Sequence, residues 1–207
     1  MSDLYVHYGC GFLCAPDEWL NFDASPTLFY ERIPVLGKLY TKNGRRFPPN
    51  VRYGDIVKGL PIKKSSARAV YCSHILDCLS YEDCQRALRN TKEILQEGGT
   101  FRLVVADCRA FWSNYTNDSS PSACSTFMER TGWGRRQHRN IVDFSVGYLG
   151  HGYRLWMWDY KGLEAELTSV GFRSIRKAEY GDSEDEHFRR VENIERWSTG
   201  IGIECRT

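Results

Sequence analysis

The sequence predicts an α/β fold: a mostly parallel sheet with one antiparallel strand near the C-terminus and helices on both faces. One observation leads to this fold class, and a second indicates the number of domains. Short runs of β-forming residues alternate along the chain with segments of helical periodicity, which is the pattern of parallel strands joined by helical crossovers. The chain has 207 residues, of which 42% are hydrophobic and 26% charged, so residues 1–207 are expected to form a single domain.

The strand candidates are rich in aromatic and β-branched residues and are bounded by turn-forming residues. They are residues 4–8, 19–23, 51–56, 67–73, 100–106, 172–179 and 198–206. The first strand stops at a turn containing Gly9 and Gly11, and the second ends in Asp23. The residues between these two strands are too few for a full crossover helix.

Two segments predict clear helices. Ser80 is followed by two acids and then by apolar residues at helical spacing, and the pair Gly98-Gly99 is expected to end this helix. The second helix is expected over residues 159–170, with Gly171 as its stop. Residues 25–50 mix aromatic and basic residues and predict one or two further helices and a loop.

Residues 107–150 have the least regular pattern and the most turn signals, and we interpret them as an insertion with short helices. The segment follows the fifth strand, so it is expected to lie over the carboxyl edge of the sheet as a lid that selects the substrate. Aromatic rings and arginines in it could bind a ring or an anion. They are Phe111, Trp112, Tyr115, Trp133, Tyr148, Arg135, Arg136 and Arg139.

Composition limits the classes of partner. The 28 Lys and Arg against 26 Asp and Glu give a net charge of only +2, which does not favour nucleic acid. No apolar run approaches the length of about 20 residues that spans a bilayer, and the start lacks the pattern of a secretory signal, so a cytoplasmic location is expected. The eight cysteines form no CxxC pair, which favours free thiols over a metal site.

Ligands of open parallel sheets bind outside the carboxyl ends of the strands. The residues expected there are Gly9, Gly11, Asp23, Asp55, Ser73, His74 and Asp107. A carboxylate such as Asp23 can accept both protons of a ribose diol, and Asp55 adds an acceptor for an adenine amino group. The glycine turn lacks the third glycine of a dinucleotide pyrophosphate site. Together these features predict a nucleoside ligand without phosphates.

A series of blocks then follows in a characteristic order along almost the whole chain. They are YGCGF at 8–12, WLNFDASP at 19–26, DIVKGLP at 55–61, SHILD at 73–77, LQEGG at 95–99, VVAD at 104–107, WMWD at 156–159 and GF at 171–172. In these blocks the sequence resembles the class I S-adenosylmethionine (SAM)-dependent methyltransferases. The nearest match is a bacterial type 11-like group that is often linked with cell-surface sugar pathways.

The resemblance implies a Rossmann-like fold, SAM as the cofactor, and methyl transfer to a small-molecule or sugar-type acceptor at oxygen or nitrogen. The cysteine spacing and the low net charge predict no metal and no nucleic acid partner. The residues expected to contact the cofactor are Gly9, Cys10, Gly11, Asp23, Asp55, Ser73 and His74. The residues expected to act in catalysis are His74, as a base, and Asp107.

Several alternatives stay open. His7, Cys78 and Arg154 depart from the pattern of the group, which favours a protein that binds SAM without turnover. Aminopropyl transfer on the same fold would need an acidic substrate cluster that the sequence does not show. Asp23 and Asp107 are also well placed to cap the helices that follow them.

Overall fold

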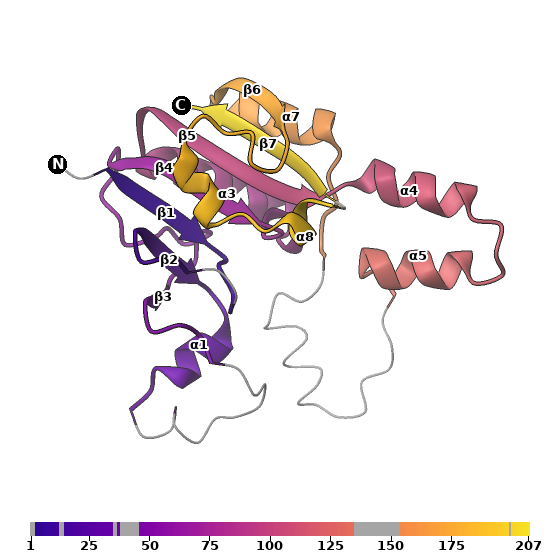
Figure 1. Cartoon of the computed structure of the whole chain (residues 1–207), viewed down its shortest axis with the longest axis horizontal. Helices are drawn as coiled ribbons and strands as arrows, with labels where there is room; N and C mark the ends of the chain where they lie inside the picture. Colours follow the sequence, from indigo (N-terminus) through magenta and orange to yellow (C-terminus); the bar gives the residue numbers. More distant parts are fainter. Residues whose placement is uncertain (1–2, 13–14, 35–36, 38–45, 135–153, 199) are drawn as a thin grey trace.

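The structure is a computed structural model of the chain. It describes residues 3–12, 15–34, 37, 46–134, 154–198 and 200–207. A single twisted sheet runs through the molecule, and a pair of helices projects from one end of it (Figure 1).

The sheet has seven strands in the order β3-β2-β1-β4-β5-β7-β6. They are β1 (Leu4–Tyr8), β2 (Trp19–Asp23), β3 (Val51–Tyr53), β4 (Ala67–Ser73), β5 (Leu95–Ala106), β6 (Arg173–Ala178) and β7 (Gly200–Arg206). All neighbouring pairs are parallel except those that β7 makes with β5 and β6, which are antiparallel. The predicted fold class, including its one antiparallel strand near the C-terminus, is therefore confirmed.

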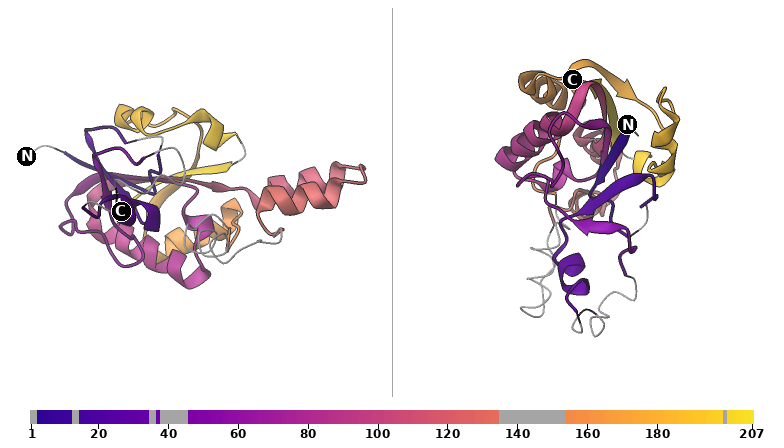
Figure 2. Two further views of the ribbon diagram at one scale, coloured as in Figure 1. Left: turned by 90° about the horizontal axis from the view of Figure 1, so that it is seen from below. Right: turned by 90° about the vertical axis from the view of Figure 1, so that its left-hand side faces the viewer.

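Helices lie on both faces of the sheet (Figure 2). The described helices are α1 (Pro26–Glu31), η1 (Leu76–Cys78), α3 (Tyr81–Ile94), α4 (Cys108–Asn117), α5 (Ala123–Thr131), α7 (Tyr160–Val170), η2 (Glu186–Arg190) and α8 (Ile194–Trp197). Helices α3 and α7 cover one face, and the segment with η2 and α8 covers the other. Ser80 caps α3 and Gly171 ends α7 in the left-handed conformation, as the sequence predicts, and Asp159 is the cap of α7.

Side chains alternate between the two faces along each strand. On the first face, β1, β4 and β5 bury Val6, Cys72 and Leu103 against helix residues such as Leu88 and Leu163. On the second face, Tyr5, Trp19 and Tyr71 pack against Phe188 and Val191, which belong to the connection between β6 and β7. The main core therefore lies under α3 and α7, and a smaller aromatic core lies under η2.

The predicted end of α3 is wrong. The helix stops at Ile94, and Leu95 is already extended and pairs with Ala67 of β4. The register of β5 against β4 then shifts over Gly98 and Gly99, and Gly98 adopts a φ of +69°. Burial of Leu95 in the sheet outweighs its helix propensity, so the two glycines serve a bulge in β5 and not a helix stop.

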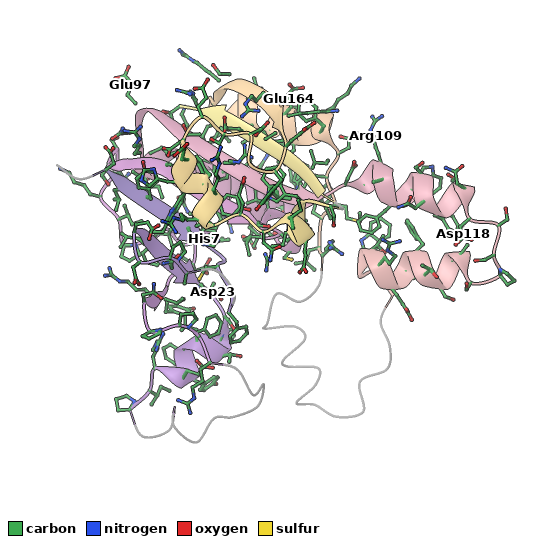
Figure 3. All side chains as sticks on the ribbon, in the orientation of Figure 1. His7, Asp23, Glu97, Arg109, Asp118 and Glu164 are labelled. Atoms are coloured by element: carbon green, nitrogen blue, oxygen red, sulfur yellow. The ribbon has the colours of Figure 1, made fainter. Side chains whose placement is uncertain are left out.

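Residues 108–131 form a helical hairpin that projects from the carboxyl end of β5 (Figures 1 and 2). Helices α4 and α5 pack through aromatic rings, with the centroids of Tyr115 and Phe127 5.1 Å apart. At its base, Arg109 Nε donates to Asp159 Oδ2 at 2.8 Å, whereas Asp118 lies at the far end (Figure 3). The short helices expected after the fifth strand are thus present in the described residues.

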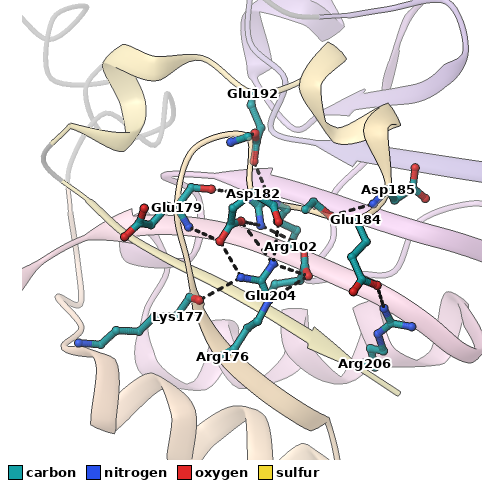
Figure 4. Close-up of polar contacts among 12 residues, drawn as sticks. Arg102, Arg176, Lys177, Glu179, Asp182, Glu184, Asp185, Glu192, Glu204 and Arg206 are labelled. Carbon is teal, nitrogen blue, oxygen red and sulfur yellow. Dashed lines mark hydrogen bonds and ion pairs between the residues drawn. The ribbon is translucent and has the colours of Figure 1, made fainter.

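A buried arginine of β5 bonds residues of the β6–β7 connection and holds this connection against the second face of the sheet (Figure 4). Arg102 of β5 is fully buried and donates to the carboxylates of Glu192, Asp182 and Glu204 and to Glu179 O. Its guanidinium also lies 4.6 Å from the centroid of the Trp197 ring. A charge in the middle of a buried strand requires such partners, because unpaired burial is strongly unfavourable.

Asp182 makes the stability of this buried cluster depend on pH. Partial burial raises the pKa of the Asp182 carboxyl. Hydrogen bonds from Arg176, Glu179 N and Arg102 lower it by more, so that its net pKa is about 2. A carboxyl with a lowered folded pKa stabilises the fold above its ordinary pKa of 3.8 and loses that contribution as the pH falls toward 2. We therefore expect Asp182→Asn to be less stable than wild type at pH 6, with a smaller difference at pH 3. Urea unfolding at both pH values measures this difference, and an equal difference at both would contradict the assignment.

Candidate functional site

A cavity of about 390 Å³ opens at the carboxyl ends of β1, β2, β3 and β4. Five of the predicted site residues line it, and they are Gly9, Gly11, Asp23, Asp55 and His74. These residues follow four different strands, so it is the parallel arrangement of the strands that brings them together.

The first side of the cavity is the glycine turn after β1, which the second strand holds in place. Asp23 lies at the end of β2 nearest α1 (Figure 3), and its Oδ2 accepts from Gly11 N at 2.9 Å. Its Oδ1 accepts from Ser25 N at 2.8 Å, so the carboxylate also orders the start of α1.

The side chain of Ile75, which follows β4, packs closely against Gly9. Its φ is +69°, and a Cβ atom on it would overlap Cγ1 and Cδ1 of Ile75. Gly11 also has a positive φ, of +60°, but a Cβ there would meet nothing within 4 Å. Both glycines adopt the left-handed conformation, which favours glycine. At Gly9 a side chain would in addition overlap Ile75.

Asp55 follows β3 and lines the outer end of the cavity. Its Oδ1 accepts from Val57 N at 2.9 Å, and Oδ2 lies 3.5 Å from the exposed Lys58 ammonium. The residue therefore shapes a turn, as Gly54-Asp55 suggests, and keeps its carboxylate at the cavity.

His74 links the end of β4 to helix α8. Its backbone has a φ of +54°, and its Nε2 lies 2.9 Å from the carbonyl oxygen of Arg196. Because a carbonyl oxygen only accepts, Nε2 must carry the proton and donate. The other nitrogen, Nδ1, is buried 3.6 Å from Oδ2 of Asp77. In this arrangement neither ring nitrogen presents a lone pair to the cavity.

Asp77 is the buried acid behind His74. Burial raises the pKa of the Asp77 carboxyl, but the neighbouring His74 and Arg154 lower it by more, so the net pKa lies below its usual value. Arg154 Nε donates to Asp77 Oδ2 at 3.0 Å, and the Asp77 carbonyl accepts from Leu155 N and Trp156 N. Arg154, a departure from the sequence pattern, is thus the charge partner of a fully buried carboxylate.

Cys78 lies beside the same cluster and lines the cavity. Burial and the nearby Asp77 raise the pKa of its thiol to about 12, in spite of the opposing charges of Arg154 and Arg196. At neutral pH it is therefore a protonated wall residue and not a nucleophile.

The sequence matches no protein-family model and no curated protein. Among solved structures, many chains are similar. One is a SAM-dependent methyltransferase from Thermotoga maritima, described as a possible histamine N-methyltransferase, with a TM-score of 0.53 and 15% identity over 100% of this chain and 83% of that one. Another is a SAM-dependent methyltransferase from Archaeoglobus fulgidus, with a TM-score of 0.51 and 12% identity over 99% and 86%.

A third similar structure is PigF solved with SAH, with a TM-score of 0.53 and 15% identity over 99% of this chain and 50% of that one. All three align with almost the whole of this chain, with TM-scores of 0.51 to 0.53. This chain has the class I methyltransferase fold. The predicted Rossmann-like architecture is therefore confirmed, and the cavity lies where ligands of open parallel sheets bind.

Three predicted site residues do not line this cavity of the methyltransferase fold. Cys10 and Ser73 border a cavity of only about 20 Å³ on the second face of the sheet, next to Val191 and Asn193. Asp107 accepts from Arg109 N at 2.9 Å and caps α4, which is the alternative role that the sequence left open. The structure thus assigns Asp107 to the helical hairpin and not to the cavity.

The predicted lid is placed differently from expectation in its described part. No residue of 108–134 lines the cavity of the methyltransferase fold, and α4 and α5 extend away from the sheet (Figure 2). The basic residues Arg135, Arg136 and Arg139, and also Tyr148, lie outside the described residues. Their role in substrate selection stays a prediction.

Sequence reasoning missed one charged residue of the cavity, Arg196. It reaches the site from the connection between β6 and β7, far along the chain from the glycine turn. A helix cap at Asn193, whose side chain accepts from Glu195 N, was the available signal for α8. Nothing in the sequence placed that helix beside β4.

Metal centres and membrane spans are two further features that a sequence of this kind could carry. No group of three or more His, Cys, Asp or Glu side chains in the described residues could hold a metal ion. None of the described helices is both long and apolar enough to cross a membrane.

Proposed function

We propose that the chain binds SAM in this cavity and transfers its methyl group to a small-molecule or sugar-type acceptor by in-line displacement. The observation that carries the proposal is the glycine turn after β1, tied through Gly11 N to the carboxylate of Asp23. This arrangement brings an open backbone and an acidic acceptor together at the carboxyl edge of a methyltransferase fold. The type 11-like group suggested by the sequence stays a prediction.

The donors and acceptors of the cavity fit a nucleoside thioether. Asp23 can accept from the ribose hydroxyls, and Asp55 provides an acceptor further out for the adenine amino group. Gly9 and Gly11 leave no side chain over the turn, and the apolar side chains of Ile56, Ile75 and Leu79 offer flat surface to the base. When bound, SAM supplies an activated methyl group on a positively charged sulfur.

The residues would then act mainly by alignment. Methyl transfer from a sulfonium releases a neutral thioether, so holding the acceptor in line with the methyl group accounts for most of the catalysis. His74 contributes position and not proton transfer in this arrangement, because its Nε2 proton is held by the Arg196 carbonyl. An acceptor that is already a good nucleophile needs no base, and such an acceptor suits this cavity best.

The same geometry favours a second candidate, a protein that binds SAM without turnover. His74 presents no lone pair to the cavity and the Cys78 thiol stays protonated. Incubating the protein with SAM labelled in the methyl group and an untargeted metabolite extract separates the two. Transfer of label to any metabolite supports methyl transfer, whereas binding of SAM with no labelled product supports the second candidate.

Asp23→Ala tests the cofactor site itself. Loss of a charged hydrogen-bond acceptor is expected to weaken binding of SAH by about 1–3 kcal/mol, a fall in affinity of about 5- to 150-fold. Isothermal titration calorimetry with SAH measures the change, and Asp17→Ala is a matched control, since Asp17 lies outside the cavity and bonds Asn50. An unchanged affinity in Asp23→Ala would show that the carboxylate serves only to hold the backbone at Gly11 and Ser25. No binding of SAH by folded wild-type protein would overturn the proposed function.

A further inference from the structure

One residue that lines the cavity, Arg196, comes from the connection between β6 and β7. The described part of this connection, residues 179–198, carries η2 and α8 across the second face of the sheet. Phe188 and Val191 pack on Tyr71, and the carboxylate of Glu192 bonds the fully buried Arg102. The segment is therefore firmly seated just before it reaches the cavity.

Arg196 of α8 is bound to the end of β4 in two ways. Its Nη1 donates to Ser73 O at 2.9 Å, and its own carbonyl oxygen accepts from His74 Nε2 at 2.9 Å. Arg196 lines the cavity, and it also borders the small cavity next to Ser73. Ser73 O satisfies one of the five N–H donors of a guanidinium, so most of them remain for other acceptors.

Arg196 makes no ion pair with any Asp or Glu of the described residues. The other arginines around this segment are paired: Arg102 and Arg176 bond buried or half-buried carboxylates, and Arg189 lies 3.8 Å from Glu186. A half-buried guanidinium that is held only by a backbone carbonyl, beside a cavity, is suited to a negatively charged ligand group.

The cavity thus has negatively charged residues on its β2–β3 side and a positively charged residue on its β4 side. Asp23 and Asp55 follow β2 and β3, whereas Arg196 is bonded to the end of β4. In the order β3-β2-β1-β4, with strands about 4.8 Å apart, the acids and the guanidinium are separated by about 10–14 Å along the sheet edge. A ligand that fills the cavity must therefore offer hydroxyl or amino donors at one end and an anion at the other.

We propose that Arg196 binds the carboxylate at the amino-acid end of the nucleoside ligand. The inference rests on the proposed function, since it takes the ligand to be SAM or SAH. The carboxylate is thus bound by a residue of the connection between β6 and β7. The two hydrogen bonds between α8 and the end of β4 orient the guanidinium.

The test compares two ligands that share the nucleoside and differ at the amino-acid end. SAH carries the carboxylate, whereas 5′-methylthioadenosine has only a methyl group on the same sulfur. In Arg196→Ala we expect the affinity for SAH to fall by about 10- to 100-fold, the range for a charged hydrogen bond. The affinity for 5′-methylthioadenosine should stay within about twofold of wild type, because that ligand never contacts the guanidinium. Arg196→Lys should lie between, since it keeps the charge and loses the fork.

Arg189→Ala is the matched control, because Arg189 lies on the same segment, is exposed and does not line the cavity. It should bind both ligands as wild type does. Binding of 5′-methylthioadenosine also reports that each variant is folded around the nucleoside site. Equal losses for both ligands in Arg196→Ala, or no loss for either, would overturn the inference. If wild type binds neither ligand, the proposed function fails instead.

Discussion

Arg102→Met is expected to lower the free energy of unfolding by about 3–5 kcal/mol, the range for removing one partner of a buried ion pair. The substitution keeps an unbranched side chain of similar length but leaves the carboxylates of Glu192, Glu204 and Asp182 without their shared guanidinium. Glu192 is the most affected, because burial already raises the pKa of its carboxyl. Urea unfolding at pH 7 measures the difference.

Two comparisons make this expectation specific. Arg206→Met removes an exposed arginine of β7 whose partner, Glu184, is also exposed, and surface changes of this kind stay within about 0.5 kcal/mol. The double variant Arg102→Met with Glu192→Leu should be more stable than Arg102→Met alone, because it removes the carboxylate that is most fully buried. If Arg102→Met is no less stable than Arg206→Met, the buried cluster does not stabilise the β6–β7 connection.

Gly9→Ala is expected to lower the free energy of unfolding by about 2–5 kcal/mol. About 1–2 kcal/mol comes from the left-handed backbone, and the rest comes from overlap of the new methyl group with Ile75. Ile75 lines the cavity, so its displacement should also reduce the affinity for SAH by more than about tenfold, or about 1.4 kcal/mol. Urea unfolding and calorimetry with SAH measure the two effects.

Gly11→Ala separates the two causes in the unfolding experiment. Gly11 has nearly the same φ as Gly9, but its new methyl group would meet no atom within 4 Å. Its loss of stability should therefore be confined to the backbone contribution of about 1–2 kcal/mol. Equal losses in the two variants would mean that the contact between the glycine turn and Ile75 is not tight.

Local sequence signals predicted most of the fold because they coincide with what the tertiary structure requires. Ser80 caps α3, and Gly171 ends α7. The signal failed at Gly98-Gly99, where a glycine pair after a helical pattern is ambiguous between a helix stop and a bulge. Pairing of Leu95 with Ala67 on the neighbouring strand decided it, and that contact is not encoded locally.

The candidate site was predictable in the part that depends on strand ends. Gly9, Gly11, Asp23 and Asp55 were found because residues after parallel strands share one edge of the sheet. Asp107 also follows a strand, but its carboxylate turns to cap α4. The sequence could not predict Arg196 as a site residue, because its position depends on how a long connection crosses the sheet. Arg102, a charge inside the run TFRLVVA, indicates only that acids from another segment reach β5, and not where α8 lies.

The position of β7 has a consequence for the order in which the molecule can assemble. The last strand of the chain lies between β5 and β6, so β6 has no neighbour in the sheet until residues 200–206 are in place. The same residues close the connection that carries Arg196. Contacts of such long sequence separation form late and slowly, because a large loop must close first. During synthesis, the part of the cavity formed by β1, β2 and β3 can therefore form well before Arg196 is in place. Full affinity for the ligand should be reached only once β7 has inserted between β5 and β6.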